Sequence, residues 1–99
     1  MSVSVVTNRK GGTRATVVPA TAKLKAAWIK NGAQDVVLSQ VMAGPDTNNW
    51  TVRIAFANWE SFGKAMQNAS NDPAIGEAIA ELDGVSELVS RRLMGTVDL

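Results

Sequence analysis

The sequence predicts an α+β domain in which a four-stranded antiparallel sheet carries its helices on one face. Three patterns predict this fold. Residues 50–57 alternate between large apolar side chains and small or polar ones, as in a strand that is covered on one side. Residues 13–31 instead place apolar side chains three and four positions apart, as in an amphipathic helix. The apolar segments along the chain follow the order strand, helix, strand, strand, helix, strand.

The first half of this order begins with a strand over Ser2–Asn8, where β-branched residues dominate. The pair Gly11–Gly12 predicts a turn after it. A glycine pair in a basic loop also suggests phosphate binding, but the glycine spacing and the final Lys-Ser/Thr of a P-loop are missing. A helix over Thr13–Asn31 follows, and Gly32 stops it. Pro19 leaves two starts open, because the helix either begins at Pro19 or begins at Thr13 and is kinked.

The middle of the chain predicts a β-hairpin. Its strands are Asp35–Ala43 and Trp50–Ala57, and the six residues Gly44–Asn49 between them are typical of a turn. Alternation divides the second strand into two faces. One face carries Trp50, Val52, Ile54 and Phe56, and the other carries Thr51, Arg53, Ala55 and Ala57.

The second half predicts two helical segments and a last strand. Asn58 is a good N-cap for a helix over Trp59–Asn68. Asp72 caps a second segment over Pro73–Leu82, which Asp83 and Gly84 are expected to end. The final strand is expected near Ser86–Met94. The complete order is the split βαβ arrangement of ferredoxin-like folds, as one domain over residues 1–99.

Composition excludes several classes of function. The chain has no Cys, no His and no Tyr, so it can build neither a Ser-His-Asp nor a Cys-His site, and it lacks the usual zinc and haem ligands. All six charges in residues 1–34 are positive, but stacking aromatics are not interleaved with them, so we expect no nucleic-acid partner. No apolar run is long enough to span a membrane, and no signal peptide is evident. We expect a cytoplasmic protein without membrane contact.

The strands predict a homodimer, because apolar residues occur on both faces of each of them. In the second strand, Val37 and Val41 oppose Val36, Leu38 and Met42. If either face stays in water, each large apolar side chain on it loses about 1.5–3 kcal/mol of transfer free energy. Pairing two copies with their uncovered faces inward removes that cost. The alternative is a patchy, exposed second face.

Several segments resemble the dimeric α/β-barrel superfamily, and within it antibiotic-biosynthesis-monooxygenase-like and NIPSNAP-like domains. The resemblance covers nearly the whole chain. It is carried by Gly32-Ala33, by Gly44, by the strand-to-helix junction Phe56–Phe62 and by Asp72-Pro73. It implies a ferredoxin-like sheet that pairs into a dimeric α/β barrel around a cavity for a small hydrophobic ligand. The superfamily includes cofactor-independent oxygenases, isomerases and haem enzymes. The absence of His from this sequence disfavours a haem site in which His ligates the iron.

Five residues are candidates for ligand binding, with no cofactor and no metal expected. Arg53 lies mid-strand beside small residues, where its guanidinium could hold an enolate or carboxylate; an ion pair with a partner subunit is an equal alternative. The aromatic candidates could equally be core or rim anchors. One of Ser39 and Gln40 should face the cavity, since they lie on opposite faces, and the same holds for Arg91 and Arg92. The candidates are Arg53, Gln40, Thr51, Trp28 and Trp59.

Two functions remain open from the sequence. The first is a cofactor-independent monooxygenase or isomerase acting on a small hydrophobic enol or aromatic substrate. In that case the substrate supplies most of the chemistry, while the protein excludes water and stabilises an oxyanion. The second is a non-catalytic small-molecule-binding or accessory homodimer. It is suggested by the shortage of proton-transfer groups on the strands.

Overall fold

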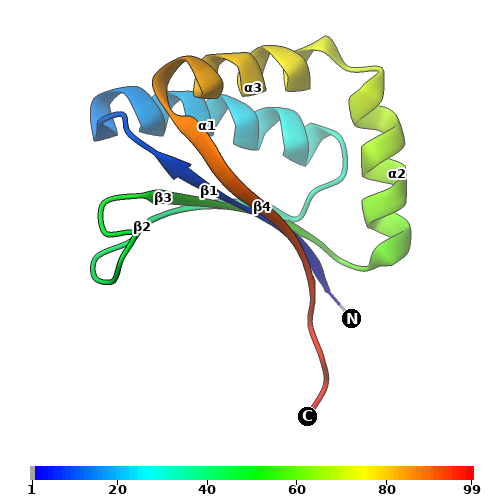
Figure 1. Ribbon diagram of the computed structural model, residues 1–99. Coiled ribbons are helices and arrows are strands. Elements are labelled where there is room, and N and C mark those ends of the chain that lie inside the picture. The colour runs from blue at the N-terminus through cyan, green and yellow to red at the C-terminus, as the bar shows by residue number, and fades with distance from the viewer. Residues whose placement is uncertain (1) are drawn as a thin grey trace.

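The computed structural model, which describes residues 2–99, has the element order β1-α1-β2-β3-α2-α3-β4. The four strands form one antiparallel sheet in the order β2-β3-β1-β4, so the α+β ferredoxin-like prediction is confirmed. In Figure 1, α1 and α3 lie side by side over one face of the sheet, α2 stands at one end, and the other face carries no helix. The elements are β1 (Val3–Lys10), α1 (Arg14–Lys30), β2 (Asp35–Gln40), β3 (Trp50–Phe56), α2 (Trp59–Ser70), α3 (Pro73–Val85) and β4 (Glu87–Gly95).

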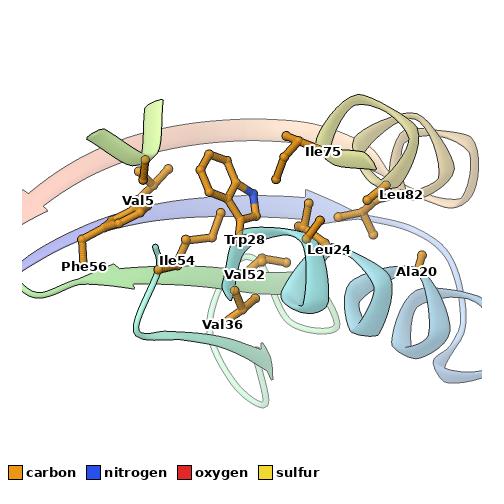
Figure 2. Close-up of a cluster of buried hydrophobic side chains, with 14 of the residues drawn as sticks. Val5, Ala20, Leu24, Trp28, Val36, Val52, Ile54, Phe56, Ile75 and Leu82 are labelled. Atoms are coloured by element: carbon orange, nitrogen blue, oxygen red, sulfur yellow. The ribbon is translucent and has the colours of Figure 1, made fainter. Parts of the chain in front are cut away.

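The core lies between the sheet and the helices. Trp50, Val52, Ile54 and Phe56 of β3 are all buried there, as their alternation predicts. The Phe56 ring makes edge-to-face contacts with the rings of Trp28 and Phe62, at centroid distances of 5.9 and 5.3 Å. Figure 2 shows Val52, Ile54, Phe56 and Trp28 between the sheet and the helices, together with Ile75 and Leu82 of α3. Such aromatic pairs stabilise a core beyond the area that they bury.

The strand β1 is longer than predicted. It continues through Arg9 and Lys10, which lie opposite Leu88 and Glu87 of β4. Arg9 therefore belongs to the strand and not to the following turn. Gly12 makes the turn possible, because its φ is +77° and a Cβ there would lie 2.5 Å from the carbonyl oxygen of Val85. This close approach is a structural reason for the glycine.

The helix α1 begins at Arg14, with Thr13 as its N-cap, and it contains Pro19. The earlier of the two predicted starts is therefore correct. At the other end of the helix, Asn31 donates a hydrogen bond of 2.8 Å to Asp72, the N-cap of α3. This bond from Asn31 is the main reason that the pKa of Asp72 is below its ordinary value, and the backbone N–H of Ala74 adds to it.

Two boundaries differ from the predictions. The hairpin turn is longer, because β2 ends at Gln40 and the chain from Val41 to Asn49 forms the connection. The helix α3 continues through Gly84 to Val85, whereas Asp83 and Gly84 were expected to end it. The Ser86 hydroxyl and backbone N–H both donate to the carbonyl oxygen of Leu82, and these bonds satisfy the last turn.

The uncovered face of the sheet is more polar than the sequence predicts. A bulge between Asn8 and Arg9 puts one extra residue into β4, and as a result both Leu88 and Leu93 lie on the helix side. The uncovered face is therefore apolar only in part. Its residues are Asp35, Val37, Ser39, Ser4, Val6, Asn8, Lys10, Thr51, Arg53, Ala55, Glu87, Ser90, Arg92 and Met94.

Candidate functional site

The candidate site is a cavity between the sheet and the helices, on the side of β4. Its volume is about 140 Å³. The side chains of β1, β3 and α1 form its floor and inner wall, α3 forms the roof, and β4 forms the side toward solvent. Its walls are mostly apolar, with a few polar groups, which is the usual composition of a small-molecule site. It is lined by Val5, Thr7, Arg9, Leu24, Trp28, Ile54, Ile79, Leu82, Asp83, Leu88 and Arg91.

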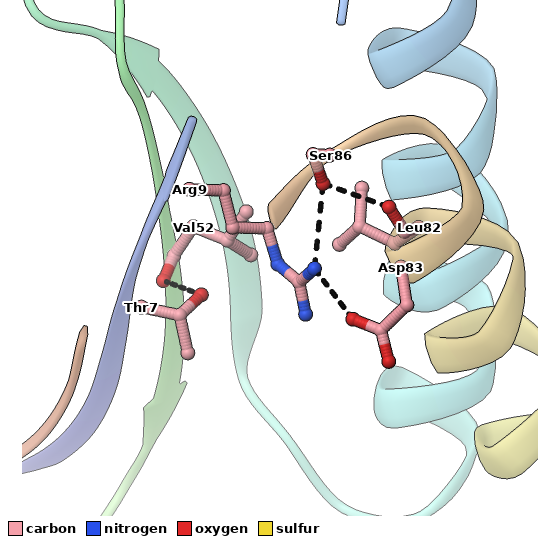
Figure 3. A network of polar contacts seen from close by, with 6 residues as sticks. All are labelled: Thr7, Arg9, Val52, Leu82, Asp83 and Ser86. Atoms are coloured by element: carbon pink, nitrogen blue, oxygen red, sulfur yellow. Dashed lines mark hydrogen bonds and ion pairs between the residues drawn. The ribbon is translucent and has the colours of Figure 1, made fainter. Parts of the chain in front are cut away.

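Arg9 is the buried cation of this cavity. Its side chain is only 6% exposed. Its Nη1 donates to Asp83 Oδ1 at 2.7 Å and to Ser86 Oγ at 3.3 Å, both at the C-terminal end of α3 (Figure 3). The pairing with Asp83 offsets the cost of holding a guanidinium away from water. It also fixes the direction of the guanidinium plane between sheet and helix.

Two fully buried N–H groups, on residues that line the cavity, have no acceptor. Among residues 2–99, the only buried side-chain nitrogens or oxygens without a hydrogen-bond partner are Arg9 Nε and Trp28 Nε1. Leaving a buried donor unpaired costs about 1–3 kcal/mol. By contrast, the indole of Trp50, which is also buried, donates to the Gly11 carbonyl oxygen at 3.0 Å. Both unpaired donors in the described chain thus belong to residues of one cavity.

The charges at the cavity leave it positive. Its lining contains the two guanidinium groups of Arg9 and Arg91 and the single carboxylate of Asp83. Arg91 is exposed at the β4 side. Because Arg9 is paired with Asp83, the one net positive charge of the lining is that of Arg91, at the solvent side of the cavity.

Of the five predicted ligand-binding residues, only Trp28 lines this cavity. Arg53 and Thr51 lie on the uncovered face, where Arg53 Nε donates to Ser4 Oγ at 3.0 Å. Gln40 pairs with Trp50 and so lies on the helix side, but at the end of its strand, near the Asn48 carbonyl oxygen. Trp59 is half exposed on α2 and contacts Phe62 edge-on. The structure therefore does not bring the five together.

The uncovered face has its own hollows. One of about 330 Å³ includes Ser4, Val6 and Arg53, and another of about 210 Å³ includes Thr51 and Arg92. Arg92, Val6, Arg53 and Val37 form one row across the four strands. Arg91 and Arg92 point to opposite sides of the sheet, as alternation predicts.

Three residues of the cavity were missed as ligand-binding candidates from the sequence. The predicted first strand ends at Asn8 and so leaves Arg9 out, although Arg9 continues the alternation of Val3, Val5 and Thr7. The sequence places Asp83 at the end of a helix, and it indicates only that one of Arg91 and Arg92 faces the cavity. Extending the β1 alternation by two residues would have found Arg9.

Neither a metal site nor a membrane-spanning helix is found within the described chain. Residues 2–99 contain no group of three or more Asp, Glu, His or Cys side chains that could hold a metal ion. No helix among them is both long and apolar enough to cross a bilayer. A hollow of about 490 Å³ lies on the outer surface between α1 and α3, among alanine, Lys and Glu residues.

No family model and no curated protein matches the sequence. Solved structures do match its fold. SnoaB, a cofactor-independent oxygenase from Streptomyces nogalater, superposes with a TM-score of 0.75 at 15% identity, over 99% of this chain and 95% of that chain. A candidate antibiotic biosynthesis monooxygenase from Bordetella bronchiseptica gives a TM-score of 0.70 at 11% identity over 97% of both chains. A third structure, a candidate antibiotic biosynthesis monooxygenase from Chloroflexus aurantiacus J-10-fl, gives a TM-score of 0.61 at 16% identity, over 99% of this chain and 95% of that chain. The chain thus has the ferredoxin-like fold of antibiotic-biosynthesis-monooxygenase-like proteins.

Proposed function

We propose that this protein is a cofactor-independent monooxygenase that oxidises a small hydroxyaromatic or enol substrate in the cavity between sheet and helices. The observation that carries the proposal is this cavity, which is apolar, positively charged and formed within a single chain. The fold of the solved relatives agrees with it, since one of them is described as a cofactor-independent oxygenase.

The substrate supplies the electrons in this scheme. A bound phenolate passes one electron to dioxygen, and the resulting phenoxyl radical and superoxide combine at the para carbon. The peroxide takes up the proton that the phenol released on ionisation. Loss of the para C–H proton, with cleavage of the O–O bond, then expels water and leaves a carbonyl group. In balance, one phenol and one dioxygen give one para-quinone and one water.

The protein contributes binding and electrostatics to this reaction. The apolar walls reduce the contact of the radical pair with bulk water. The cationic lining stabilises the phenolate, which is the form that can reduce dioxygen. Trp28 is the one residue predicted from the sequence that retains a ligand-binding role here, as part of the inner wall.

The experiment is oxygen uptake by the purified protein with a panel of phenols and enols under ¹⁸O₂. We expect one labelled oxygen in each quinone and one dioxygen consumed per product. Ile79→Trp, at a half-exposed lining position, should fill the cavity and reduce turnover at least tenfold. Val37→Trp, at a similarly exposed position on the uncovered face, is the matched control and should retain turnover. Equal turnover in both variants would contradict the proposed site.

The alternative, a non-catalytic binding protein, has one observation in its favour. Asp83 is the only carboxylate that lines the cavity, and it is already paired with Arg9. Ligand binding without oxygen uptake across the whole panel would favour this alternative.

We also propose a homodimer, formed on the uncovered face and along β4. An apolar strip along β4 and just after it supports the dimer: Leu88, Val89, Leu93, Met94 and Val97 are all about half exposed or more, and Met94 lies on the uncovered face. Such a strip is typical of an interaction surface. In the dimer, Arg53 and Thr51 would face a chamber shared by the two copies. Light scattering at micromolar concentration tests this: the double variant V89K/M94K should be monomeric and folded, and a monomeric unmodified protein would refute the dimer. A cytoplasmic location stays a prediction of the sequence.

A further inference from the structure

The uncovered face of the sheet carries two arginines close together. Arg53 of β3 and Arg92 of β4 both lie opposite Val6 of β1, one on each side of it, so the three side chains share a face. Neighbouring strands lie about 4.8 Å apart, which places the two arginine Cα atoms about 10 Å from each other. Both side chains are exposed, and no ion pair within residues 2–99 includes either of them. Two like charges are thus held side by side without a carboxylate partner.

A buried serine orients one of the two guanidinium groups. Arg53 Nε donates to Ser4 Oγ at 3.0 Å, and Ser4 is only 4% exposed. Ser4 belongs to β1, which lies between β3 and β4. The Arg53 side chain therefore extends from β3 across β1, toward the strand that carries Arg92. A guanidinium bonded in this way keeps two further nitrogens as a planar fork of donors.

Two adjoining hollows surround the arginine pair. Arg53 lines the one of about 330 Å³, Arg92 lines the one of about 210 Å³, and Val6 belongs to both. Among the described residues, one carboxylate lines these hollows, that of Asp46, and its Oδ2 accepts a hydrogen bond of 3.1 Å from Asn8. Two cations and one anion leave the combined hollow with a net positive charge, which attracts an anionic ligand.

The placement of the two arginines favours a tetrahedral anion with two negative charges. Guanidinium groups that approach from opposite sides need acceptor oxygens on opposite sides of the ligand. A phosphate group offers such oxygens, whereas both oxygens of a carboxylate lie at one end. Guanidinium forks also bind phosphate through two parallel hydrogen bonds, which are strong because both partners are charged.

We propose that Arg53 and Arg92 bind one tetrahedral dianion over Val6, either free phosphate or the phosphoryl group of a phosphate monoester. Ser4 is a positioning residue that acts through Arg53. This site lies on the face of the sheet opposite the cavity in which we place oxygenation. It requires no turnover.

The anion should also strengthen the homodimer, and this consequence rests on the proposed pairing through the uncovered face. In that dimer, two guanidinium groups from each copy would face the shared chamber. Enclosing charges without a counter-charge is costly. A dianion enclosed with them offsets that cost, so its binding should be linked to association of the two copies.

The first test is calorimetric titration with inorganic phosphate in chloride buffer at constant ionic strength, at a pH where the dianion predominates. We expect one phosphate per chain. Sulfate should also bind, whereas acetate should bind at least tenfold more weakly. Methyl phosphate separates the two sources: affinity at least equal to that of phosphate indicates a monoester, and tenfold weaker binding indicates the free anion. Equal affinities for acetate and phosphate, or no binding of either dianion, would overturn the inference.

Variants locate the anion. Arg53→Met and Arg92→Met should each weaken phosphate binding at least tenfold. Arg91→Met is the matched control, since it removes an exposed arginine of the same strand that points to the other side of the sheet, and it should bind phosphate normally. Normal binding in both Arg53→Met and Arg92→Met would refute the site. Loss of binding in Arg14→Met alone would move the anion to the basic loop before α1, with the same consequence.

A double variant tests the positioning role of Ser4. Ser4→Ala leaves both positive charges in place but removes the acceptor of Arg53 Nε, and it should weaken phosphate binding several-fold. In the Arg53→Met protein the same change should have no further effect, because Ser4 acts only through Arg53. A full additional loss in the double variant would show that Ser4 has a general structural role instead.

The competing occupant of the arginine pair is a carboxylate of the second copy, and Asp46→Asn distinguishes the two. If a dianion binds, this change removes a neighbouring negative charge, so phosphate should bind several-fold more tightly and the dimer should not weaken. A dimer weakened at least tenfold by Asp46→Asn, with equal dissociation constants in phosphate and in chloride, would assign the arginines to ion pairs between copies and overturn the inference.

The anion site and the homodimer fail in different ways. Light scattering should give a dimer dissociation constant at least tenfold lower in phosphate than in chloride of equal ionic strength. Phosphate binding with the expected variant effects, by a protein that is monomeric in both salts, would refute the homodimer and leave the anion site in place. A stable dimer that binds no oxyanion would do the reverse.

Discussion

The two faces of the sheet differ in what they bury and in what they leave unpaired. The helix-covered face packs large apolar side chains and also holds Arg9 and two donors without acceptors. The uncovered face carries Arg53 and Arg92 in one row, with the Arg53 Nε satisfied by Ser4. Charge is thus found on both faces, but only on the covered face is it removed from water.

This difference shows why exposure matters more than residue type in locating a site. An exposed guanidinium is screened by solvent and its interactions are weak. A buried one acts on its neighbours through a medium of lower dielectric constant, so it can alter the ionisation of a ligand. Arg9, and not the more conspicuous Arg53, satisfies this condition.

The largest difference between the faces should be in stability. Phe56→Ala removes a fully buried ring that contacts Trp28 and Phe62, and it should lower the free energy of unfolding by about 3–5 kcal/mol. Urea denaturation measures the change. Val37→Ala, at a position 45% exposed on the uncovered face, should cost less than about 1 kcal/mol. Similar losses in the two variants would mean that the uncovered face is also a packed interface, as in the proposed dimer.

A smaller effect should follow from separating Arg9 from its partner. Asp83→Asn leaves a buried guanidinium without its carboxylate, and it should reduce the free energy of unfolding by about 1–2 kcal/mol, since Asp83 itself is half exposed. The control is Glu81→Gln, which breaks the exposed pair with Lys23 and should cost less than about 0.5 kcal/mol. If both changes cost the same, the Arg9 pair is as solvated as a surface pair.

The sequence predicted the covered face well because periodicity reports burial. The alternation of β3, the capping residues Asn58 and Asp72, and the single-face arrangement of helices all depend on local patterns, and all are found in the structure. The bulge in β4 could not be predicted, because it depends on pairing with β1 over more than 75 residues of sequence. That bulge places both Leu88 and Leu93 on the helix side of the sheet, so the uncovered face carries fewer apolar side chains than the sequence predicts.

The candidate site was less predictable than the fold, for a related reason. A cavity is the space left between elements, and its lining comes from β1, β3, β4, α1 and α3 together. Local patterns do not show which end of a strand meets which turn of a helix. Trp28 was found because a tryptophan on an apolar helix stripe is conspicuous, whereas Arg9 resembled one more cation of a basic loop.

The smallest expected effect tests the uncovered face directly. Arg53→Met removes an exposed guanidinium whose Nε donates to Ser4, so we expect the free energy of unfolding to change by less than about 0.5 kcal/mol. Because Arg53 lies on the face of the sheet opposite the cavity, oxygen uptake with a confirmed substrate should also stay the same. Oxygen uptake by this variant beside Ile79→Trp makes the comparison. A tenfold loss of turnover in Arg53→Met alone would assign the substrate to the chamber between two copies, where the sequence first indicated it, and not to the cavity under the helices.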